Sequence, residues 1–211
     1  MVKVKICGLT NGPDARLALE LGADFAGFVF YPRSPRAAAP AIVREIIRES
    51  KAGSRSNASF VGVFVNEEAE IVRRIFGQCG LDIAQLHGDE TPEYCRCLGL
   101  PYWKAVRVKD ESSLLSIESY GGDAVLLDTF TEGNYGGTGR AFPISVVRAA
   151  VERGLKIVVA GGISSANLPA VLAARPWAVD VSSALEERPG KKDAIKMREF
   201  FRKIREIGGR P

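Results

Sequence analysis

The sequence predicts a minimal closed barrel of eight parallel strands and eight helices, the (β/α)8 or TIM-barrel architecture, as a single domain over residues 1–211. Short β-branched or apolar runs alternate eight times with amphipathic stretches, which is the pattern of repeated βα units. The length of 211 residues and the 46% of hydrophobic residues suffice for one core of ordinary composition. No GxGxxG motif follows the first run, which disfavours the alternative, an open doubly wound sheet.

Each predicted strand is a short apolar run of the kind that is buried on both faces. In chain order the runs are Val2–Ile6, Phe25–Phe30, Phe60–Val65, Ile83–Leu86, Tyr102–Val106, Ala124–Leu127, Lys156–Val159 and Ala178–Val181. Parallel strands of a barrel end at one rim, so the residues that follow these runs are expected to meet there.

The predicted helices lie between these runs and have apolar residues at helical spacing. In chain order they are Pro13–Leu21, Pro40–Ser50, Glu67–Cys79, Pro92–Leu98, Glu111–Tyr120, Pro143–Arg153, Ser164–Ala174 and Lys191–Ile207. Thr91 before Pro92 predicts a capped helix start, and Ser164 predicts another N-cap. Four glycines lie just past helical stretches, where a left-handed C-cap is expected: Gly22, Gly80, Gly99 and Gly154.

The charge pattern and the cysteine and histidine counts exclude several classes of site. The 29 Lys and Arg against 25 Asp and Glu give a net charge of +4 with both signs mixed, so we expect no nucleic-acid partner. The basic stretch Lys191–Arg205 is interpreted as the solvated face of the last helix. A single histidine excludes sites that need two imidazoles, and we expect no metal. The four cysteines lack zinc-ligand spacing and are expected to be reduced.

The apolar runs are far shorter than the roughly 20 residues that cross a bilayer. No charged-then-apolar leader opens the chain. We therefore expect a cytoplasmic protein with no membrane partner. A small anionic ligand is compatible with the modest positive charge.

Polar residues and glycines close or follow the predicted strands, at the rim where barrels carry their reactive groups. These residues include Cys7, Arg36, Asn66, His87, Arg107, Asp128, Gly161, Gly162, Asp180, Ser182 and Ser183. The turns after the seventh and eighth strands are the usual phosphate site of such barrels, which predicts phosphate binding at Gly161, Gly162, Ser182 and Ser183. The alternative is that these glycines only form tight βα turns.

Several segments resemble the phosphoribosylanthranilate isomerase family of tryptophan biosynthesis, in the family's order and from the first strand to the last. They are Lys5–Thr10, Gly27–Arg36, Val61–Asn66, Gln85–Gly88, Leu126–Asp128, Tyr135–Gly139, Ala160–Gly162 and Ala178–Ser183. The sequence departs from the family's pattern in several places, among them Ala184, where glycine is usual.

The resemblance implies an Amadori rearrangement of N-(5-phosphoribosyl)anthranilate to 1-(2-carboxyphenylamino)-1-deoxy-D-ribulose 5-phosphate, without cofactor or metal. It implies that Cys7 is the general base for the sugar C2 proton and that Asp128 is the general acid for the furanose oxygen. Taken alone, Cys7 is also compatible with a small buried residue and Asp128 with a cap of the following loop.

The resemblance also implies contacts with the substrate. Arg36 is the candidate anchor of the anthranilate carboxylate, because a guanidinium can hold a carboxylate through two parallel hydrogen bonds. His87 and Asp180 are candidate substrate contacts, and a structural role for each remains open. The expected partner is a small phosphorylated substrate, and the protein is expected to be a monomer or a homodimer.

Three alternatives remain. Two are related sugar-phosphate barrels, the histidine-pathway isomerase and indole-glycerol-phosphate synthase. Cys7 disfavours the histidine-pathway isomerase, because that family looks to use a pair of aspartates in catalysis. The lack of a matching Lys and Glu set disfavours indole-glycerol-phosphate synthase. The third is a catalytically silent barrel that only binds phosphorylated ligands.

Overall fold

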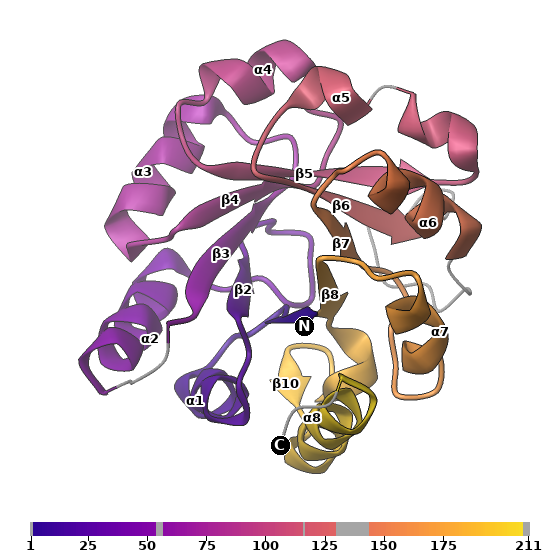
Figure 1. Cartoon of the computed structure of the whole chain (residues 1–211). Coiled ribbons are helices and arrows are strands. Elements are labelled where there is room, and N and C mark those ends of the chain that lie inside the picture. Colours follow the sequence, from indigo (N-terminus) through magenta and orange to yellow (C-terminus); the bar gives the residue numbers. More distant parts are fainter. Residues whose placement is uncertain (1, 54–56, 116, 130–143, 209–211) are drawn as a thin grey trace.

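A computed structural model describes residues 2–53, 57–115, 117–129 and 144–208. The eight predicted strands form one closed parallel barrel in sequence order, with helices packed around it (Figure 1). They are β1 (Lys3–Ile6), β2 (Phe25–Val29), β3 (Ser59–Phe64), β4 (Ile83–Leu86), β5 (Tyr102–Val108), β6 (Ala124–Thr129), β7 (Ile157–Val159) and β8 (Ala178–Val181). Because β1 pairs with both β2 and β8, the sheet closes, and the predicted (β/α)8 fold is confirmed.

The helices around the barrel are close to those predicted. They are α1 (Gly12–Leu21), α2 (Pro40–Gly53), α3 (Ala69–Cys79), α4 (Pro92–Cys97), α5 (Ile117–Tyr120), α6 (Ile144–Glu152), α7 (Leu168–Ala173) and α8 (Ala194–Gly208). The predicted helix Glu111–Tyr120 is divided into a 3₁₀ turn, η1 (Glu111–Leu114), and α5. The family-like segment Tyr135–Gly139 and the predicted helix start Pro143 lie outside the described residues.

The two predicted N-caps have different outcomes. Thr91 is confirmed, because its Oγ1 accepts a hydrogen bond from the backbone nitrogen of Tyr94 at 3.1 Å. Ser164 is wrong as an N-cap, because α7 begins only after Asn167. Asn167 instead accepts from the Ser164 backbone nitrogen at 2.9 Å and donates to the Gly162 carbonyl at 2.8 Å. It therefore braces the turn that follows β7.

The last helix begins at Ala194, not at Lys191 as predicted. Lys191 and Lys192 form β10 (Lys191–Lys192), which pairs antiparallel with β9 (Glu186–Arg188) after a 3₁₀ turn, η2 (Ser183–Leu185). Gly190 turns the chain between these strands with a φ of 80°, and the Lys192 backbone nitrogen donates to Asp14 rather than to a helical carbonyl. Lys192 is only 3% exposed, so the solvated-face interpretation is wrong for this residue.

The barrel interior is apolar near the strand starts and polar near the strand ends. Phe25 and Trp103 pack edge to face at 4.8 Å, and Trp103 meets Trp177 at 5.7 Å. Side chains alternate in direction along each strand, so Gln85 in β4 and His87 directly after it point to the same side. The aromatic rings thus fill the barrel near the strand starts, and the polar side chains lie near the strand ends.

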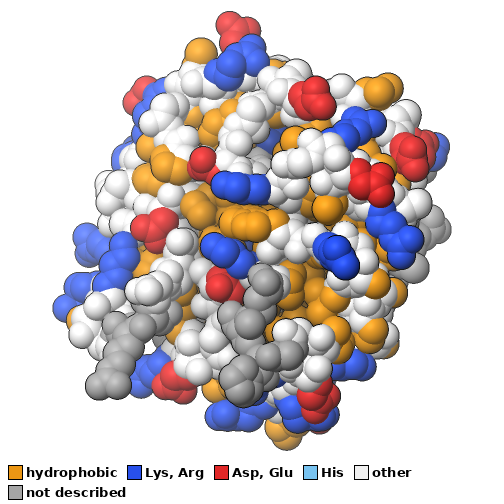
Figure 2. All heavy atoms as spheres, in the orientation of Figure 1, with side chains coloured by type: hydrophobic (Ala, Val, Ile, Leu, Met, Phe, Trp, Pro, Cys, Tyr) orange, Lys and Arg blue, Asp and Glu red, His pale blue; other side chains and the backbone are white. Residues whose placement is uncertain are grey.

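Charged side chains of both signs are interspersed with hydrophobic ones on the face shown in Figure 2, in agreement with the mixed charge pattern of the sequence. Among the described residues, no helix combines the length and apolarity that a bilayer span requires.

Candidate active site

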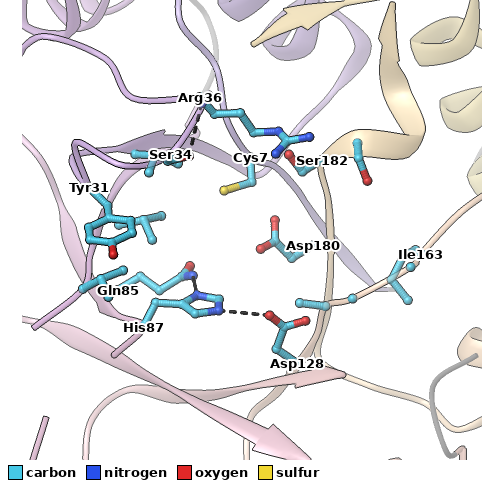
Figure 3. A pocket seen from close by; sticks show the side chains of 17 residues that line it. Cys7, Tyr31, Ser34, Arg36, Gln85, His87, Asp128, Ile163, Asp180 and Ser182 are labelled. Carbon is cyan, nitrogen blue, oxygen red and sulfur yellow. Dashed lines mark hydrogen bonds and ion pairs between the residues drawn. The ribbon is translucent and has the colours of Figure 1, made fainter. Parts of the chain in front are cut away.

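The strand ends surround a pocket at the C-terminal mouth of the barrel (Figure 3). Its lining includes every site residue that the sequence predicts: Cys7, Arg36, His87, Asp128, Gly161, Gly162, Asp180, Ser182 and Ser183. Tyr31, Ser34, Gln85 and Ile163 lie on the same walls. A thiol, carboxyl groups, an imidazole and a guanidinium therefore share one cavity.

Cys7 follows β1 and lies beside a buried lysine that the sequence analysis did not single out. Lys5 is fully buried, and its Nζ donates to Asp180 Oδ2 at 2.9 Å. Lys5 and Cys7 are close neighbours, because a Cβ added at Gly27 would meet Lys5 Cε at 2.9 Å and Cys7 Sγ at 3.1 Å. Glycine at position 27 thus leaves room for the ammonium and the thiol on one wall of the pocket.

The charges around Cys7 act in opposite directions. Burial raises the pKa of the Cys7 thiol above its ordinary value, and the positive charge of Lys5 opposes this shift without cancelling it. Burial alone would lower the pKa of Lys5, but the Asp180 carboxylate and Cys7 raise it. Asp180 therefore keeps a permanent cation next to the thiol.

Asp128 ends the inward-facing row of β6 and pairs with the only histidine of the chain. His87 Nε2 lies 3.0 Å from Asp128 Oδ2, and His87 Nδ1 lies 2.7 Å from Gln85 Nε2 (Figure 3). Asp128 is 3% exposed and Gln85 is 1% exposed. The carboxyl group thus has a nitrogen partner held by a buried amide.

Arg36 is held at the pocket wall by a buried carboxylate from β9. Its Nε lies 2.9 Å from Glu186 Oε1, and its Nη2 lies 2.7 Å from Glu186 Oε2. Lys192 Nζ donates to the same carboxylate at 3.0 Å. Burial would raise the pKa of Glu186, but its bonds to Arg36 and Lys192 lower it below the ordinary value. Burial lowers the pKa of Lys192 below its ordinary value despite the neighbouring Glu186 carboxylate, so Arg36 is the cation that this cluster presents to the pocket.

The two turns predicted to bind phosphate lie together on one wall. Gly161 and Gly162 have positive φ values of 79° and 67°, a backbone conformation that glycine adopts without strain. Ser182 Oγ is buried and makes no hydrogen bond to the described residues. Ser183 begins η2, the short extra helix that such barrels use at this position. The wall therefore offers backbone and hydroxyl donors to an anion.

Ala184, which departs from the family's usual glycine, lies in the middle of η2. Its side chain is exposed, and its φ is not among the positive values of the described residues. A Cβ is therefore accommodated there without backbone strain.

A further buried ion pair, Lys104 with Glu90, braces the rim beside His87. Lys104 Nζ donates to Glu90 Oε2 and to the Gly88 carbonyl, both at 2.7 Å. Glu90 Oε1 accepts from the backbone nitrogens of Asn66 at 2.9 Å and Gly88 at 3.0 Å. The pair therefore fixes the turns after β3 and β4.

Several polar residues in or beside the site were not found by sequence reasoning, among them Lys5, Gln85, Glu186 and Lys192. A signal existed for two of them, because Lys5 precedes Cys7 by two residues and Gln85 precedes His87 by two. Residues two apart on a strand point to the same face, so the inward direction of Cys7 and His87 extends to these neighbours. Glu186 and Lys192 depend on the β9–β10 hairpin, which the sequence analysis did not predict.

Comparisons with known proteins agree with this geometry. A family model described as N-(5'phosphoribosyl)anthranilate (PRA) isomerase matches residues 4–203. The N-(5'-phosphoribosyl)anthranilate isomerase of Trichlorobacter lovleyi is 46% identical over 207 residues, which cover 98% of this chain and 99% of the relative.

Two solved structures have the same fold over the whole chain. The phosphoribosyl anthranilate isomerase of Thermotoga maritima is 39% identical with a TM-score of 0.89, covering 99% of this chain and 100% of that one. A phosphoribosyl anthranilate isomerase in complex with reduced 1-(o-carboxyphenylamino)-1-deoxyribulose 5-phosphate is 36% identical with a TM-score of 0.84 and the same coverage.

Proposed function

The chain belongs to the family of N-(5'-phosphoribosyl)anthranilate isomerases, enzymes of tryptophan biosynthesis, and we propose that Cys7 and Asp128 perform the proton transfers of its rearrangement. The observation that carries this proposal is that a thiol and a carboxyl group line one pocket whose other walls offer a guanidinium and glycine-rich turns. The product analogue bound by a relative has the matching groups: a carboxyphenylamino group, a reduced deoxyribulose chain and a phosphate.

The proposed steps balance within the substrate and the two side chains. Asp128 gives its proton to the furanose oxygen as the bond from that oxygen to C1 breaks, and the nitrogen lone pair forms a C1=N iminium. The Cys7 thiolate removes the C2 proton, the C–H electron pair becomes a C1=C2 bond, and the iminium π electrons return to nitrogen. The enol hydroxyl then returns a proton to Asp128, and the Cys7 thiol returns one to C1. No external oxidant or reductant enters this scheme.

The Lys5 ammonium and the iminium of the ring-opened substrate favour the thiolate form of Cys7 at the proton-abstraction step. Because burial raises the pKa of the thiol, the neutral form dominates in the free enzyme at neutral pH. The Lys5 ammonium lies beside the sulfur throughout. The iminium adds a second positive charge only after the ring opens, so the fraction of Cys7 present as thiolate increases at the step that uses it.

Binding groups for the two ends of the substrate lie on different walls. We assign the phosphate to the backbone and hydroxyl donors of Gly161, Gly162, Ser182 and Ser183. We assign the anthranilate carboxylate to Arg36. Because Glu186 occupies the Nε and Nη2 edge of that guanidinium, the substrate carboxylate meets the remaining edge, Nη1 with Nη2. His87 and Asp180 lie between these two anchors and contact the sugar.

Kinetics of purified variants test the catalytic roles. Cys7→Ala and Asp128→Ala are each expected to lower kcat at least about a hundredfold, the lower range for general acid–base groups. Cys97→Ala and Asp123→Ala change exposed residues away from the pocket and serve as matched controls with unchanged kcat. Near-normal turnover by a folded Cys7 or Asp128 variant would remove that residue from its role. Calorimetric binding of substrate without turnover by the unmodified protein would favour a silent phosphate-binding barrel.

We further propose that the enzyme works in the cytoplasm on this small phosphorylated substrate, as a monomer or a homodimer, without a nucleic-acid or membrane partner. Membership of a biosynthetic family supports this location, and a dimeric phosphoribosylanthranilate isomerase is known from Thermotoga maritima. Light scattering on the purified protein distinguishes the two oligomeric states.

A further inference from the structure

The side chain of His87 lies between a buried amide and the proposed acid. Gln85 Nε2 is 2.7 Å from His87 Nδ1, and His87 Nε2 is 3.0 Å from Asp128 Oδ2 (Figure 3). Gln85 lies in β4 and His87 directly follows the strand, where its backbone nitrogen still donates to the Phe64 carbonyl of β3 at 2.8 Å, so the two side chains point to the same side. The three side chains therefore form a linear arrangement from the barrel interior to the reacting carboxyl group.

A neutral imidazole has one N–H, and the partner of one ring nitrogen decides which nitrogen carries it. An amide N–H of Gln85 that points at Nδ1 requires a lone pair on Nδ1. The ring proton must then be on Nε2, where it faces Asp128. The opposite amide orientation would place an Nδ1–H against Gln85 Oε1 and would leave a lone pair of Nε2 facing the carboxyl group.

The surroundings of Gln85 favour the first orientation. Gln85 Oε1 is buried and has no hydrogen-bond partner among the described residues. If the amide were reversed, the NH2 group with its two donors would occupy that same position. A buried carbonyl oxygen without a partner is less unfavourable than a buried N–H without one. The amide is thus better accommodated with its nitrogen toward His87.

We propose that Gln85 is a positioning residue that holds His87 in the Nε2–H tautomer, so that His87 donates to Asp128. The proposal rests on the assignment of Asp128 as the acid. When Asp128 gives up its proton, negative charge develops in a buried pocket, where an uncompensated charge is costly. The His87 Nε2–H already points at the Asp128 carboxyl group, and the hydrogen bond that it donates becomes stronger as the negative charge forms. Because the Gln85 amide is neutral, it selects this tautomer without adding a charge of its own.

The tautomer can be measured directly, because His87 is the only histidine in the chain. Protein labelled with ¹⁵N-histidine gives one ring pattern in a long-range ¹H–¹⁵N NMR spectrum. We expect a protonated Nε2 and an unprotonated Nδ1 at neutral pH in the free enzyme. A protonated Nδ1 would overturn the proposal, and this reading does not depend on activity.

Two variants separate the influence of Gln85 from that of Asp128. Gln85→Glu replaces the donor with an acceptor of nearly the same shape, so we expect Nδ1 to become protonated. We also expect kcat to fall at least about tenfold with KM within about threefold, because a wrongly placed ring proton affects the transition state. Gln78→Glu, on the exposed face of α3, is the matched control with an unchanged ring pattern. A folded Gln85→Glu protein with the original pattern would refute the role of Gln85.

Asp128→Asn gives a second measurement that does not depend on the folding of the Gln85 variant. An amide at position 128 can donate or accept by rotating, so it no longer selects a tautomer. We expect Nε2 to stay protonated because Gln85 is intact, and movement of the proton to Nδ1 would overturn the proposal. Near-normal turnover of Asp128→Asn would contradict the role of Asp128 as the acid but not the role of Gln85. The NMR pattern would still show which ring nitrogen Gln85 leaves unprotonated.

Discussion

At the scale of single residues, the site depends on charges buried in pairs. Lys5 with Asp180 and Arg36 with Glu186 place cations at the pocket while their partner carboxylates offset the cost of burying them. Cys7 differs from these groups, because its burial is only partly offset by the neighbouring Lys5. The reactivity of the thiol and the orientation of the guanidinium are therefore the properties to measure at this scale.

The raised pKa of Cys7 predicts slow alkylation at neutral pH. Iodoacetamide reacts with the thiolate, whose fraction rises as the pH approaches the pKa. Since the shift is upward, we expect half-maximal labelling of Cys7 at a pH above about 8.5, the ordinary value for cysteine. Mass spectrometry of the Cys7 peptide measures this, with the exposed Cys97 as an internal reference for the reagent. A half-maximal pH below the ordinary value would show that Lys5 outweighs burial.

Glu186 is expected to determine substrate affinity through Arg36. Glu186→Gln weakens the fork that orients the guanidinium and leaves Lys192 without its carboxylate. Hydrogen bonds to charged groups contribute about 1.5–3 kcal/mol, so we expect KM to rise about tenfold or more while kcat changes less. Glu187→Gln alters the exposed neighbour and is the control. An unchanged KM in the folded variant would mean that Arg36 does not need this anchor.

At the scale of elements, the strands and most helices could be predicted because their signals are local. The run Ile83–Leu86 is both the predicted and the observed β4, and Thr91 caps α4 as its side-chain chemistry requires. The β9–β10 hairpin could not be predicted in this way. It is short, and it is fixed by contacts across the chain from Thr10 and Asp14 to Gly190 and Lys191.

The same distinction holds for the site. Residues at strand ends were found because parallel strands share a rim, and this rule needs only the positions of the strands. Glu186 was not found because its contact with Arg36 joins residues 150 positions apart through the hairpin. Local sequence patterns carry no information on such a pairing. The sequence therefore predicts the reacting groups better than the groups that orient them.

The buried pair of Lys104 and Glu90 is expected to stabilise the rim elements. Lys104→Met leaves Glu90 buried with its backbone donors but without its cation. Breaking a buried pair by removing one partner costs about 3–5 kcal/mol, so we expect the free energy of unfolding to fall by about 3 kcal/mol or more. Urea denaturation measures this difference. Lys109→Met, at an exposed position just after β5, is the control, and equal stability of both variants would argue against a structural role for the pair.

At the scale of the whole molecule, the two ends of the chain are joined at the closure of the barrel. β1 pairs with β8 over four residue pairs, from Lys3 with Ala178 to Ile6 with Val181. Beyond the strands, Asp14 on α1 binds the β9–β10 hairpin. Its Oδ1 accepts from Lys191 Nζ at 2.6 Å, and its Oδ2 accepts from the Lys192 backbone nitrogen at 2.8 Å. The hairpin that carries Glu186 is thus tied to the first helix.

This link predicts a pH-dependent contribution to stability. Burial would raise the pKa of Asp14, but its bonds to Lys191, Asn11 and the Lys192 backbone lower it. Because the folded pKa lies below the unfolded one, the stabilisation is present above about pH 4, the ordinary aspartate value, and is lost as the pH falls through the lowered value. We expect Asp14→Asn to lower the free energy of unfolding by about 1–2 kcal/mol at neutral pH. The difference from the wild type should narrow in acid, where protonated Asp14 resembles asparagine.

Denaturant titrations at several pH values measure this difference, and hydrogen exchange locates it. Relative to the wild type, Asp14→Asn should increase the exchange rate at Lys192, whose backbone N–H loses a charged acceptor, more than in the central strands. Glu20→Gln removes a carboxylate from the exposed face of the same helix and is the matched control. If the stability difference stays constant down to acid pH, the ionised form of Asp14 does not contribute to the free energy of unfolding through its contacts with the hairpin. Because Glu186 and Arg36 depend on the same hairpin, a loosened link should also raise KM, which connects barrel closure to substrate binding.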